Sequence, residues 1–404
     1  MTPDDVRAAA AELHALHQRF APLFGYAQAQ HHALTYLRGL LLHEGRKNAE
    51  AMALSCGAGR VDALQDFLAA SPWEHCPVQQ EIQAAFAETL VPSTTTWELG
   101  TVGVVDESSY PKKGTHSVGV ARQWCGRLGK KDNCQVGVYL VGVTPAGCAL
   151  LEHQLYLTED WILDKGRRQE AGVPRRITFR TKPEIALDLH AQVQRAGHVQ
   201  LDWLTFDEGY GRDGDFLAAL ERRGQRYVGE VPVTTTVWTE DPATQIPDYS
   251  GRGPRPKRPV RDSVRSVKEV GESLSAAAWR VLCLRAGSGE PVVFEFAAVR
   301  VWAMRQQGPG PTVWLLLRRP LGGVGEVKYY VSNGAADVPL EILALVGGCR
   351  MRVEEYFEDG KSHLGMGQYE CRSWAGWHHH MTLVALAHLL VTGVRQRLKK
   401  KGAG

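Results

Sequence analysis

Apolar residues recur at helical spacing through about the first 95 positions of the chain. The runs extend from Asp4 to Phe20, Leu34 to Leu42, Ala49 to Leu54 and Val61 to Ala70, with breaks at Ser55–Gly59 and at Ser71–Pro72. An apolar face that repeats every three to four residues indicates amphipathic helices that pack on one another. We therefore predict an N-terminal helical domain over residues 1–95.

The period changes near residue 96, where short apolar runs typical of buried strands begin. The predicted strands are Thr101–Asp106, Asn133–Thr144, Cys148–Leu157, Leu201–Phe206 and Tyr227–Val231, and the predicted helices are Pro183–Ala196 and Asp215–Arg223. A hairpin at Thr144–Gly147 joins the second and third strands. Three antiparallel strands followed by alternating helices and strands indicate an α/β fold, a mixed sheet flanked by helices, over residues 96–231.

A β-rich segment interrupts this alternation over residues 232–335, and we interpret it as an inserted subdomain. Its predicted strands are Ala278–Arg285, Pro291–Met304, Thr312–Arg318 and Val327–Ser332. It also contains a loop, residues 251–268, with seven basic residues and one acid. From Pro339 the chain is predicted to be helical again, so that residues 336–398 complete the α/β domain and residues 399–404 form a basic tail.

Composition narrows the class of protein without identifying it. Apolar residues make up 44% and charged residues 23% of the 404, which is ordinary globular usage. No apolar run approaches the 18 or so residues that span a bilayer, and the N-terminus lacks the layout of a secretory signal. The eight cysteines show no CxxC spacing, which favours reduced thiols in a cytoplasmic protein. The net charge is +3 overall but −4 over residues 1–95, so helices there could contact nucleic acid only through a local patch.

Three carboxylates stand where they could form one oxygen-rich cage. Asp106 and Asp207 end predicted strands, and Glu354 lies on a predicted helix that also carries Arg350 and Lys361 at spacings that share one face. Carboxylate oxygens are preferred ligands of Mg²⁺ and Mn²⁺, and a pair of such ions supports phosphodiester cleavage. Each acid alone is an ordinary cap or surface residue. Glu358 shares the face of Glu354 and is the fallback ligand.

The sequence around these residues resembles the DDE superfamily transposases of bacterial insertion sequences. VGVVDESSYPKKG, which contains Asp106, is similar to the first catalytic block of that family, and LTFDEGYGRDGDFLAAL, which contains Asp207, is similar to the second. The third block in relatives is Tyr, two residues, Arg, three residues, Glu, six residues, Lys. Arg350, Glu354 and Lys361 match it, whereas Gly347 stands at the tyrosine position.

The resemblance implies an RNase H-like catalytic fold with a β-strand insertion before the catalytic glutamate. It implies Mg²⁺-dependent cleavage at transposon ends and strand transfer into target DNA, with Asp106, Asp207 and Glu354 holding two Mg²⁺ ions, for which Mn²⁺ could substitute. Arg350 and Lys361 would assist at the phosphate. The implied partner is double-stranded DNA, both terminal inverted repeats and target, bound by a homodimer at the bacterial nucleoid with no membrane involved.

Several basic residues are candidates for DNA contact. The candidates are Arg46, Lys47, Lys112, Lys113, Arg252, Arg255, Lys257, Arg258, Arg261, Arg265 and Lys268, together with the C-terminal tail. Lys130 and Lys131, in the turn before a predicted strand, could equally be solvated or contact phosphates. Some relatives hold a flipped base with a tryptophan of the insertion, and Trp238, Trp302 and Trp314 lie in the comparable region here as core or stacking residues.

Three alternatives remain beside this interpretation. A domesticated protein could keep the fold and bind DNA without transposing. Residues 209–214 match GxGxxG, the pattern of a dinucleotide site in an oxidoreductase, although Asp207 and Asp213 would repel a pyrophosphate. His378, His379 and His380 could suggest a metal site, but successive helical positions point about 100° apart and cannot converge on one ion.

Overall fold

The computed structural model describes residues 2–57, 60–91, 98–246, 262–284, 292–305 and 308–402. The chain divides into two compact units. Unit 1 comprises Met1–Thr95, Val105–Gln200 and Arg352–Gly404, and unit 2 comprises Thr96–Val104 and Leu201–Met351. Strand β1 (Val102–Pro111) therefore begins in unit 2 and continues in unit 1.

The strands of unit 1 are arranged around the long strand β3 (Lys130–Thr144). β2 (Ala121–Cys125) pairs antiparallel with its first five residues, β4 (Gly147–Leu155) pairs antiparallel with its residues 137–144, and β1 is its other neighbour. The tight turn between β3 and β4 pairs Thr144 with Gly147, which confirms the predicted hairpin.

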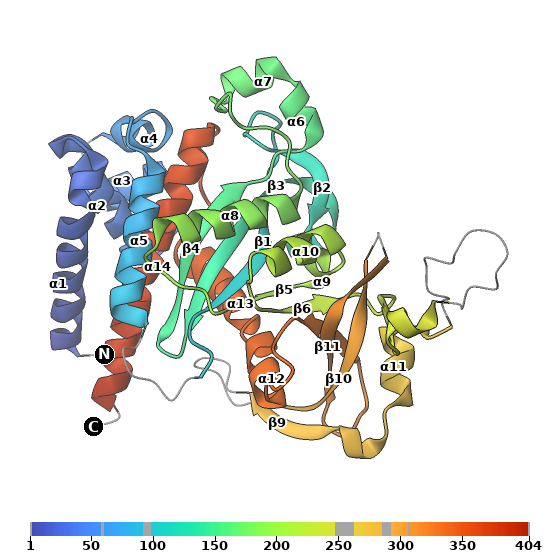
Figure 1. Ribbon diagram of the computed structural model, residues 1–404. Coiled ribbons are helices and arrows are strands. Elements are labelled where there is room, and N and C mark those ends of the chain that lie inside the picture. The colour runs from blue at the N-terminus through green and yellow to red at the C-terminus, as the bar shows by residue number, and fades with distance from the viewer. Residues whose placement is uncertain are drawn as a thin grey trace. The chain divides into compact units, whose positions relative to one another are not determined.

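Helices of unit 1 pack on these strands and on one another. The unit contains α1 (Pro3–Phe20), α2 (Ala27–Leu42), α3 (Ala49–Ser55), α4 (Val61–Ala69), α5 (His75–Leu90), α6 (Glu159–Leu163), α7 (Lys165–Glu170), α8 (Lys182–Ala196), α13 (Met351–Glu358, from its second residue) and α14 (Trp374–Gly402), with short 3₁₀ turns at Ala21–Phe24 and Gly126–Leu128. α8 lies across β3 and β4, and α14 packs against β4, α5, α4 and α2 (Figure 1). The predicted N-terminal helices thus belong to the same unit as β2, β3 and β4.

Buried amides fix α5 to an irregular point of β4. The β3–β4 register shifts between Leu140 and Val141, which leaves Leu151 without a strand partner. Gln79 donates to the carbonyl oxygens of Leu150 (2.8 Å) and Leu151 (3.0 Å), and Gln83 donates to Leu151 (2.8 Å). These bonds matter because a buried carbonyl without a partner costs free energy.

Unit 2 is built on a sheet whose order, starting from β1, is β1-β5-β6-β12-β11-β10-β7-β8, with β9 also paired to β10. Among the described residues the β5–β6 pair is parallel, and the pairs from β6 onward are antiparallel. The strands are β5 (Trp203–Phe206), β6 (Tyr227–Val231), β7 (Thr236–Trp238), β8 (Val264–Ser266), β9 (Arg280–Leu284), β10 (Val292–Arg305), β11 (Gly308–Pro320) and β12 (Lys328–Ser332).

The helices of unit 2 include the crossover between its two parallel strands. They are α9 (Glu208–Gly211), α10 (Gly214–Arg222), α11 (Val267–Ser273) and α12 (Leu340–Gly348), with 3₁₀ turns at Pro242–Gln245 and Ala276–Ala278. α9 and α10 connect β5 to β6, and α12 packs on β6 and β9. The structure confirms the predicted α/β class, an RNase H-like mixed sheet flanked by helices, and the four strands expected after residue 278.

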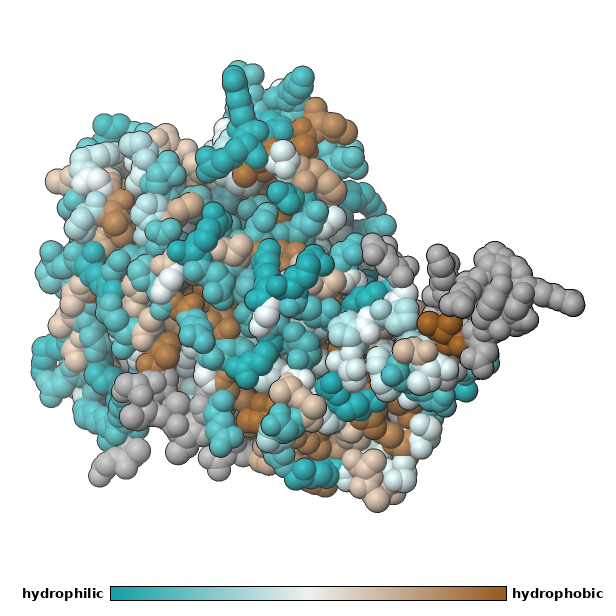
Figure 2. Space-filling view, in the orientation of Figure 1, coloured by the Kyte–Doolittle hydropathy of each residue, from teal (hydrophilic) through white to brown (hydrophobic). Residues whose placement is uncertain are grey.

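The surface is mostly hydrophilic in the view of Figure 2, and the cysteines form no disulfide bonds. Hydrophilic residues predominate on the face shown in Figure 2, where hydrophobic residues form small patches. Within the described ranges, no helix is both long and apolar enough to cross a membrane. All eight cysteines are free thiols.

Candidate active site

Asp106 lies in the middle of β1, not at its end. The strand continues to Pro111, so the prediction of a strand that stops at Asp106 is wrong. Ser108, Ser109 and Tyr110 are buried, and their burial keeps this part of the chain in the extended strand. The Asp106 side chain is half-buried, and its Oδ1 accepts a hydrogen bond of 2.7 Å from the Glu107 amide.

Asp207 directly follows β5, as predicted, and begins α9 as its N-terminal cap. Its Oδ1 accepts hydrogen bonds from the amides of Gly209 (2.9 Å) and Tyr210 (3.4 Å). The amides at a helix N-terminus lack partners within the helix, and a capping carboxylate satisfies them. The side chain is half-buried and is held in place by its own turn.

Arg350, Glu354 and Lys361 do not share one regular helix, contrary to the prediction. The expected helix is divided into α12 and α13, and Arg350 lies in the turn between them, in unit 2. Lys361 lies in a π-helical segment, Asp359–His363, that follows α13. Because a π-helix bonds each residue to the fifth one along the chain, here the Leu364 amide to the Asp359 carbonyl, the spacing expected for an α-helix no longer holds. Glu354 is exposed on α13.

Lys361 and Asp106 nevertheless interact electrostatically within unit 1. Burial lowers the pKa of Lys361 below its ordinary value of 10.5, the positive charge of Arg127 lowers it further, and the negative charge of Asp106 raises it. The Lys361 ammonium also lies 5.4 Å from the centroid of the Phe357 ring. The first and third predicted blocks thus contribute groups of opposite charge that act on each other.

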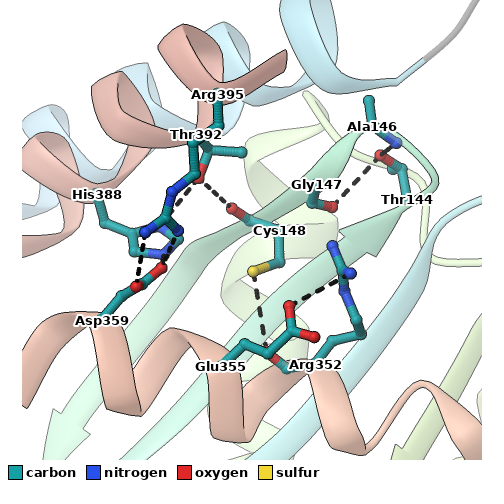
Figure 3. Close-up of polar contacts among 10 residues, drawn as sticks. All are labelled: Thr144, Ala146, Gly147, Cys148, Arg352, Glu355, Asp359, His388, Thr392 and Arg395. Atoms are coloured by element: carbon teal, nitrogen blue, oxygen red, sulfur yellow. Dashed lines mark hydrogen bonds and ion pairs between the residues drawn. The ribbon is translucent and has the colours of Figure 1, made fainter. Parts of the chain in front are cut away.

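A polar network holds the segment after α13 against α14 (Figure 3). Both terminal nitrogens of Arg395 donate to the Asp359 carboxylate, one of them at 2.9 Å. His388, which is fully buried on α14, lies 3.5 Å from the same carboxylate and 3.4 Å from the Thr392 hydroxyl. Hydrogen bonds from His388 and Arg395 outweigh burial and keep the pKa of Asp359 well below its usual range.

Each of these anchoring residues escaped the sequence analysis. Asp359 and Arg395 are charged residues on predicted helices, and nothing in the local pattern distinguishes them from solvated ones. Arg127 was also missed, although the stretch Arg127-Leu-Gly-Lys-Lys131 carries a turn signal. In the structure Gly129 adopts the left-handed conformation at the tip of a hairpin. The network therefore anchors the C-terminal end of α13, the helix that carries Glu354.

The predicted carboxylates are divided between the two units. Asp106 and Glu354 belong to unit 1 and Asp207 to unit 2. Over the part of the chain that the structure describes, no group of three or more His, Cys, Asp or Glu side chains is close enough together to hold a metal ion. The donor chemistry itself fits a hard divalent cation, because all three side chains offer carboxylate oxygens. Glu358, the fallback ligand, is exposed at the end of α13.

Two of the candidate DNA-binding lysines are engaged inside unit 1. Lys47 is only 7% exposed, and its ammonium donates to the carbonyls of Leu40 (2.7 Å) and His43 (2.5 Å) at the end of α2. The Lys112 ammonium donates to the Tyr369 carbonyl at 3.1 Å and lies 3.6 Å from the centroid of that ring. These contacts give both lysines structural roles within unit 1.

The other candidates are exposed or lie outside the described residues. Arg46 pairs with Glu370 at 2.8 Å on the surface, and Lys113 is exposed. Arg265 and Lys268 are exposed in unit 2, at β8 and α11. Five candidates of the basic loop fall outside the described residues: Arg252, Arg255, Lys257, Arg258 and Arg261.

The basic C-terminal stretch is helical and largely paired with acids. α14 continues to Gly402, so most of the predicted tail belongs to this helix. Arg397 donates to Glu12 of α1, and Lys401 lies 2.9 Å from Asp5 of the same helix. Of these residues Lys401 belongs to the predicted basic tail, and its pair with Asp5 offsets part of the positive charge of the tail.

The tryptophans of the insertion differ in exposure. Trp238 is buried and lies opposite Trp302 in the β7–β10 pair, which makes Trp238 a core residue. Trp302 and Trp314 are half-buried, and the Trp314 indole donates to the Ala335 carbonyl at 2.9 Å. At the position where relatives carry a tyrosine, Gly347 packs against Val228 and Tyr330.

The glycine motif at residues 209–214 serves packing and capping. A Cβ on Gly211 would lie 1.9 Å from the Glu230 carbonyl oxygen, so only glycine lets α9 approach β6 this closely. Asp207 occupies the amides at the start of α9, and Asp213 accepts from the amides of Asp215 and Phe216 at the start of α10. The amides that a pyrophosphate would need are therefore already bonded to carboxylates.

The three consecutive histidines of α14 point to different partners, as predicted. His378 bonds to the Trp374 carbonyl, His379 to the carbonyls of Leu68 and Trp73, and His380 to the Tyr36 hydroxyl at 2.7 Å. All three are buried, and burial keeps the pKa of each below its ordinary value. His379 and His380 thus join α14 to the N-terminal segment, whereas His378 bonds within its own helix.

Comparison with known proteins adds two findings. A family model described as DDE superfamily endonuclease matches residues 19–291, a stretch that contains Asp106 and Asp207 and ends before Glu354. The chain is also similar to the probable transposase for insertion sequence element IS701 of Microchaete diplosiphon, with 28% identity over 198 residues. That alignment covers 48% of this chain and 47% of the relative, so the chain spans about half the length of the curated relative it matches.

Proposed function

The chain belongs to the DDE superfamily endonucleases, and from this premise we propose that it is a DNA transposase. It would cleave DNA strands at the ends of an insertion sequence and transfer the freed ends into target DNA. The similarity to the IS701 protein supports this choice among endonuclease activities, because the name of that relative describes a transposase.

We propose that Asp106, Asp207 and Glu354 hold two divalent cations, Mg²⁺ with Mn²⁺ as a substitute. Such ions, when bound, activate a water and stabilise the leaving oxygen of a phosphodiester. In this proposal the capping turn orients the Asp207 carboxylate, and the Asp359 network holds the helix that carries Glu354. Lys361 and Arg350 bind the phosphate, where a cation neutralises charge that develops during cleavage.

The family match over residues 19–291, which includes the blocks of Asp106 and Asp207, carries the proposal, and the electrostatic interaction of Asp106 with Lys361 supports it. A carboxylate that binds a cation and an ammonium that binds the phosphate must be close neighbours in such a site. These two residues come from distant blocks of the sequence and interact within one unit. The partial burial of Lys361 strengthens its interaction with a phosphate, since fewer water molecules screen the charge.

A cleavage assay on the terminal inverted repeats of the encoding element tests this function. The full chain is incubated with an end-labelled duplex that carries one repeat, in Mg²⁺, Mn²⁺, Ca²⁺ or excess EDTA. We expect strand cleavage at the repeat boundary in Mg²⁺ and Mn²⁺, binding without turnover in Ca²⁺, and no cleavage in EDTA. Cleavage in excess EDTA contradicts the metal-dependent mechanism.

The same assay separates the transposase from a domesticated DNA-binding protein. Specific binding to the repeat without cleavage in any divalent ion would favour the domesticated protein. Matched variants Asp207→Asn and Glu354→Gln should bind the repeat and leave it uncut, and Asp213→Asn, which alters a cap on the neighbouring helix, should still cleave. Sedimentation of the protein–DNA complex then tests whether it contains the homodimer that we expect.

A further inference from the structure

The hairpin formed by β2 and β3 presents an aromatic side chain to solvent. In its antiparallel register Trp124 lies directly opposite Lys131, and Arg122 lies two residues earlier on the same face. Trp124 is 53% exposed, although indoles are among the side chains that gain most from burial.

The register makes this exposure a fixed property of the hairpin. Cys125 and Cys134 face the other side, where they are fully buried with Val136. Because successive side chains of a strand point to opposite faces, burial of Cys125 places Trp124 outside. A slip of one residue would expose the two cysteines, so Trp124 cannot be buried without breaking this cluster.

The same hairpin is strongly basic. Residues 121–132 contain four basic side chains and one acid, Asp132, which lies 3.3 Å from Lys130. Arg122, Arg127 and Lys131 are exposed. An exposed indole among cations is a combination that suits nucleic acid, because cations bind phosphates and the indole stacks on a base.

The hairpin tip is attached to β1, the strand that carries Asp106. The Arg127 amide donates to the Ser109 hydroxyl at 3.3 Å, and the Cys125 thiol donates to the same oxygen at 3.4 Å. Ser109 lies on β1 three residues after Asp106, which is about 10 Å along a strand. The Arg127 charge also acts on Lys361.

We propose that the β2–β3 hairpin binds unpaired nucleotides of a DNA strand beside the bond that is cleaved, with Trp124 stacked on a base and Arg122, Arg127 and Lys131 on phosphates. The proposal rests on the transposase function for the location of the cleaved bond. It commits to single-stranded DNA because a base inside a duplex is stacked on its neighbours and offers no free face to an indole.

Fluorescence anisotropy with labelled oligonucleotides tests this binding without any cleavage. The full chain is added, in buffer with EDTA, to labelled oligo(dT) of about 20 nucleotides. A labelled duplex of equal length is titrated separately. Trp124→Ala should weaken binding of oligo(dT) by about five- to a hundredfold, as expected for loss of one stacked base, and should change duplex binding less than about twofold. Trp124→Phe should restore most of the affinity.

Matched variants identify the other contacts and the alternatives. Arg122→Ala with Lys131→Ala should reduce the salt dependence of oligo(dT) binding by about 0.7 for each lost phosphate contact. Tyr26→Ala, which removes another exposed aromatic ring of unit 1, should leave oligo(dT) affinity unchanged. Thermal unfolding of Trp124→Ala should match the wild type, since the indole is exposed.

Two results overturn the proposal. One is unchanged oligo(dT) affinity in Trp124→Ala, and the other is a change of oligomeric state in that variant, which would assign the indole to contact with a second copy of the chain. Either result is independent of the cleavage assay. Wild-type protein that binds oligo(dT) through Trp124 but cuts no repeat would instead contradict the transposase function and leave the hairpin's binding site in place.

Discussion

Arg395 donates both of its terminal nitrogens to the carboxylate of Asp359, and so joins the end of α14 to the segment that follows the Glu354 helix. The same carboxylate lies 3.5 Å from the buried His388. One acid therefore holds two residues of α14, as Figure 3 shows.

Replacing this acid should loosen the segment. Asp359→Asn removes the charge that Arg395 and His388 share, and we expect it to lower the free energy of unfolding by about 1–3 kcal/mol. Urea denaturation at neutral pH measures this loss. Glu358→Gln, which changes the exposed neighbour, should shift stability by less than about 0.5 kcal/mol. Equal stability of Asp359→Asn and the wild type would show that the network contributes nothing.

The pH dependence of that difference has a defined sign. Because the pKa of Asp359 is lower in the folded state than its ordinary 3.8, its contribution is fully present above pH 3.8 and is lost as the pH falls below it. The difference in unfolding free energy between wild type and Asp359→Asn should therefore shrink in acid. A difference that stays constant down to the acid transition would contradict the assignment.

Lys112 should make stability rise at alkaline pH. Burial lowers its pKa from 10.5 to about 8, so between these values the folded protein has lost a proton that the unfolded chain still holds. The free energy of unfolding should therefore increase from about pH 8 to 10.5, by at most about 3 kcal/mol. Lys112→Met should remove this increase, measured as wild type minus variant in urea, while the exposed Lys113→Met should keep it.

Asp106 should be required for cleavage and dispensable for binding. Asp106→Asn removes one negative charge and almost no volume, so the strand and the DNA surface are preserved. We expect no detectable strand cleavage and unchanged affinity for the terminal repeat. Glu107→Gln, a change at the next carboxylate, should still cleave, and cleavage by Asp106→Asn would exclude Asp106 as a metal ligand.

The basic loop should set the salt dependence of DNA binding. Replacing Arg252, Arg255, Lys257, Arg258 and Arg261 with alanine should lower affinity and reduce the salt slope by about one for each lost phosphate contact. A double variant, Arg7→Ala with Arg60→Ala, is the control, because each of these arginines is paired with a neighbouring aspartate. An unchanged slope in the loop variant would place the loop away from DNA.

Elements with a strong local pattern could be predicted from the sequence. The helix Pro183–Ala196 was expected from its apolar face, and the structure adds the cap that begins it, where Thr181 and Glu184 bond to each other's amides. The strand before Asp207 and the hairpin at Thr144–Gly147 were predicted for similar reasons. In each case the residues that determine the conformation are neighbours in the sequence.

What could not be predicted depends on distant partners or on small changes of helix geometry. Lys47 resembles a solvent-exposed lysine in sequence, and only the position of the α2 carboxyl end shows why its ammonium is buried. The π-helical segment at Asp359 has no periodic signature, yet it changes the direction in which Lys361 points. The end of β1 was misjudged because its buried serines look like turn residues.

Gly211 approaches Glu230 so closely that folding alone requires a glycine at this position, whatever the activity of the protein. In a library of substitutions screened only for soluble expression, position 211 should accept glycine alone, because any side chain would displace α9 from β6. Gly214, whose Cβ would meet only the flexible Arg305 side chain at 3.7 Å, should accept several residues in the same screen. A glycine-rich signature can therefore persist in descendants that have lost every enzymatic role.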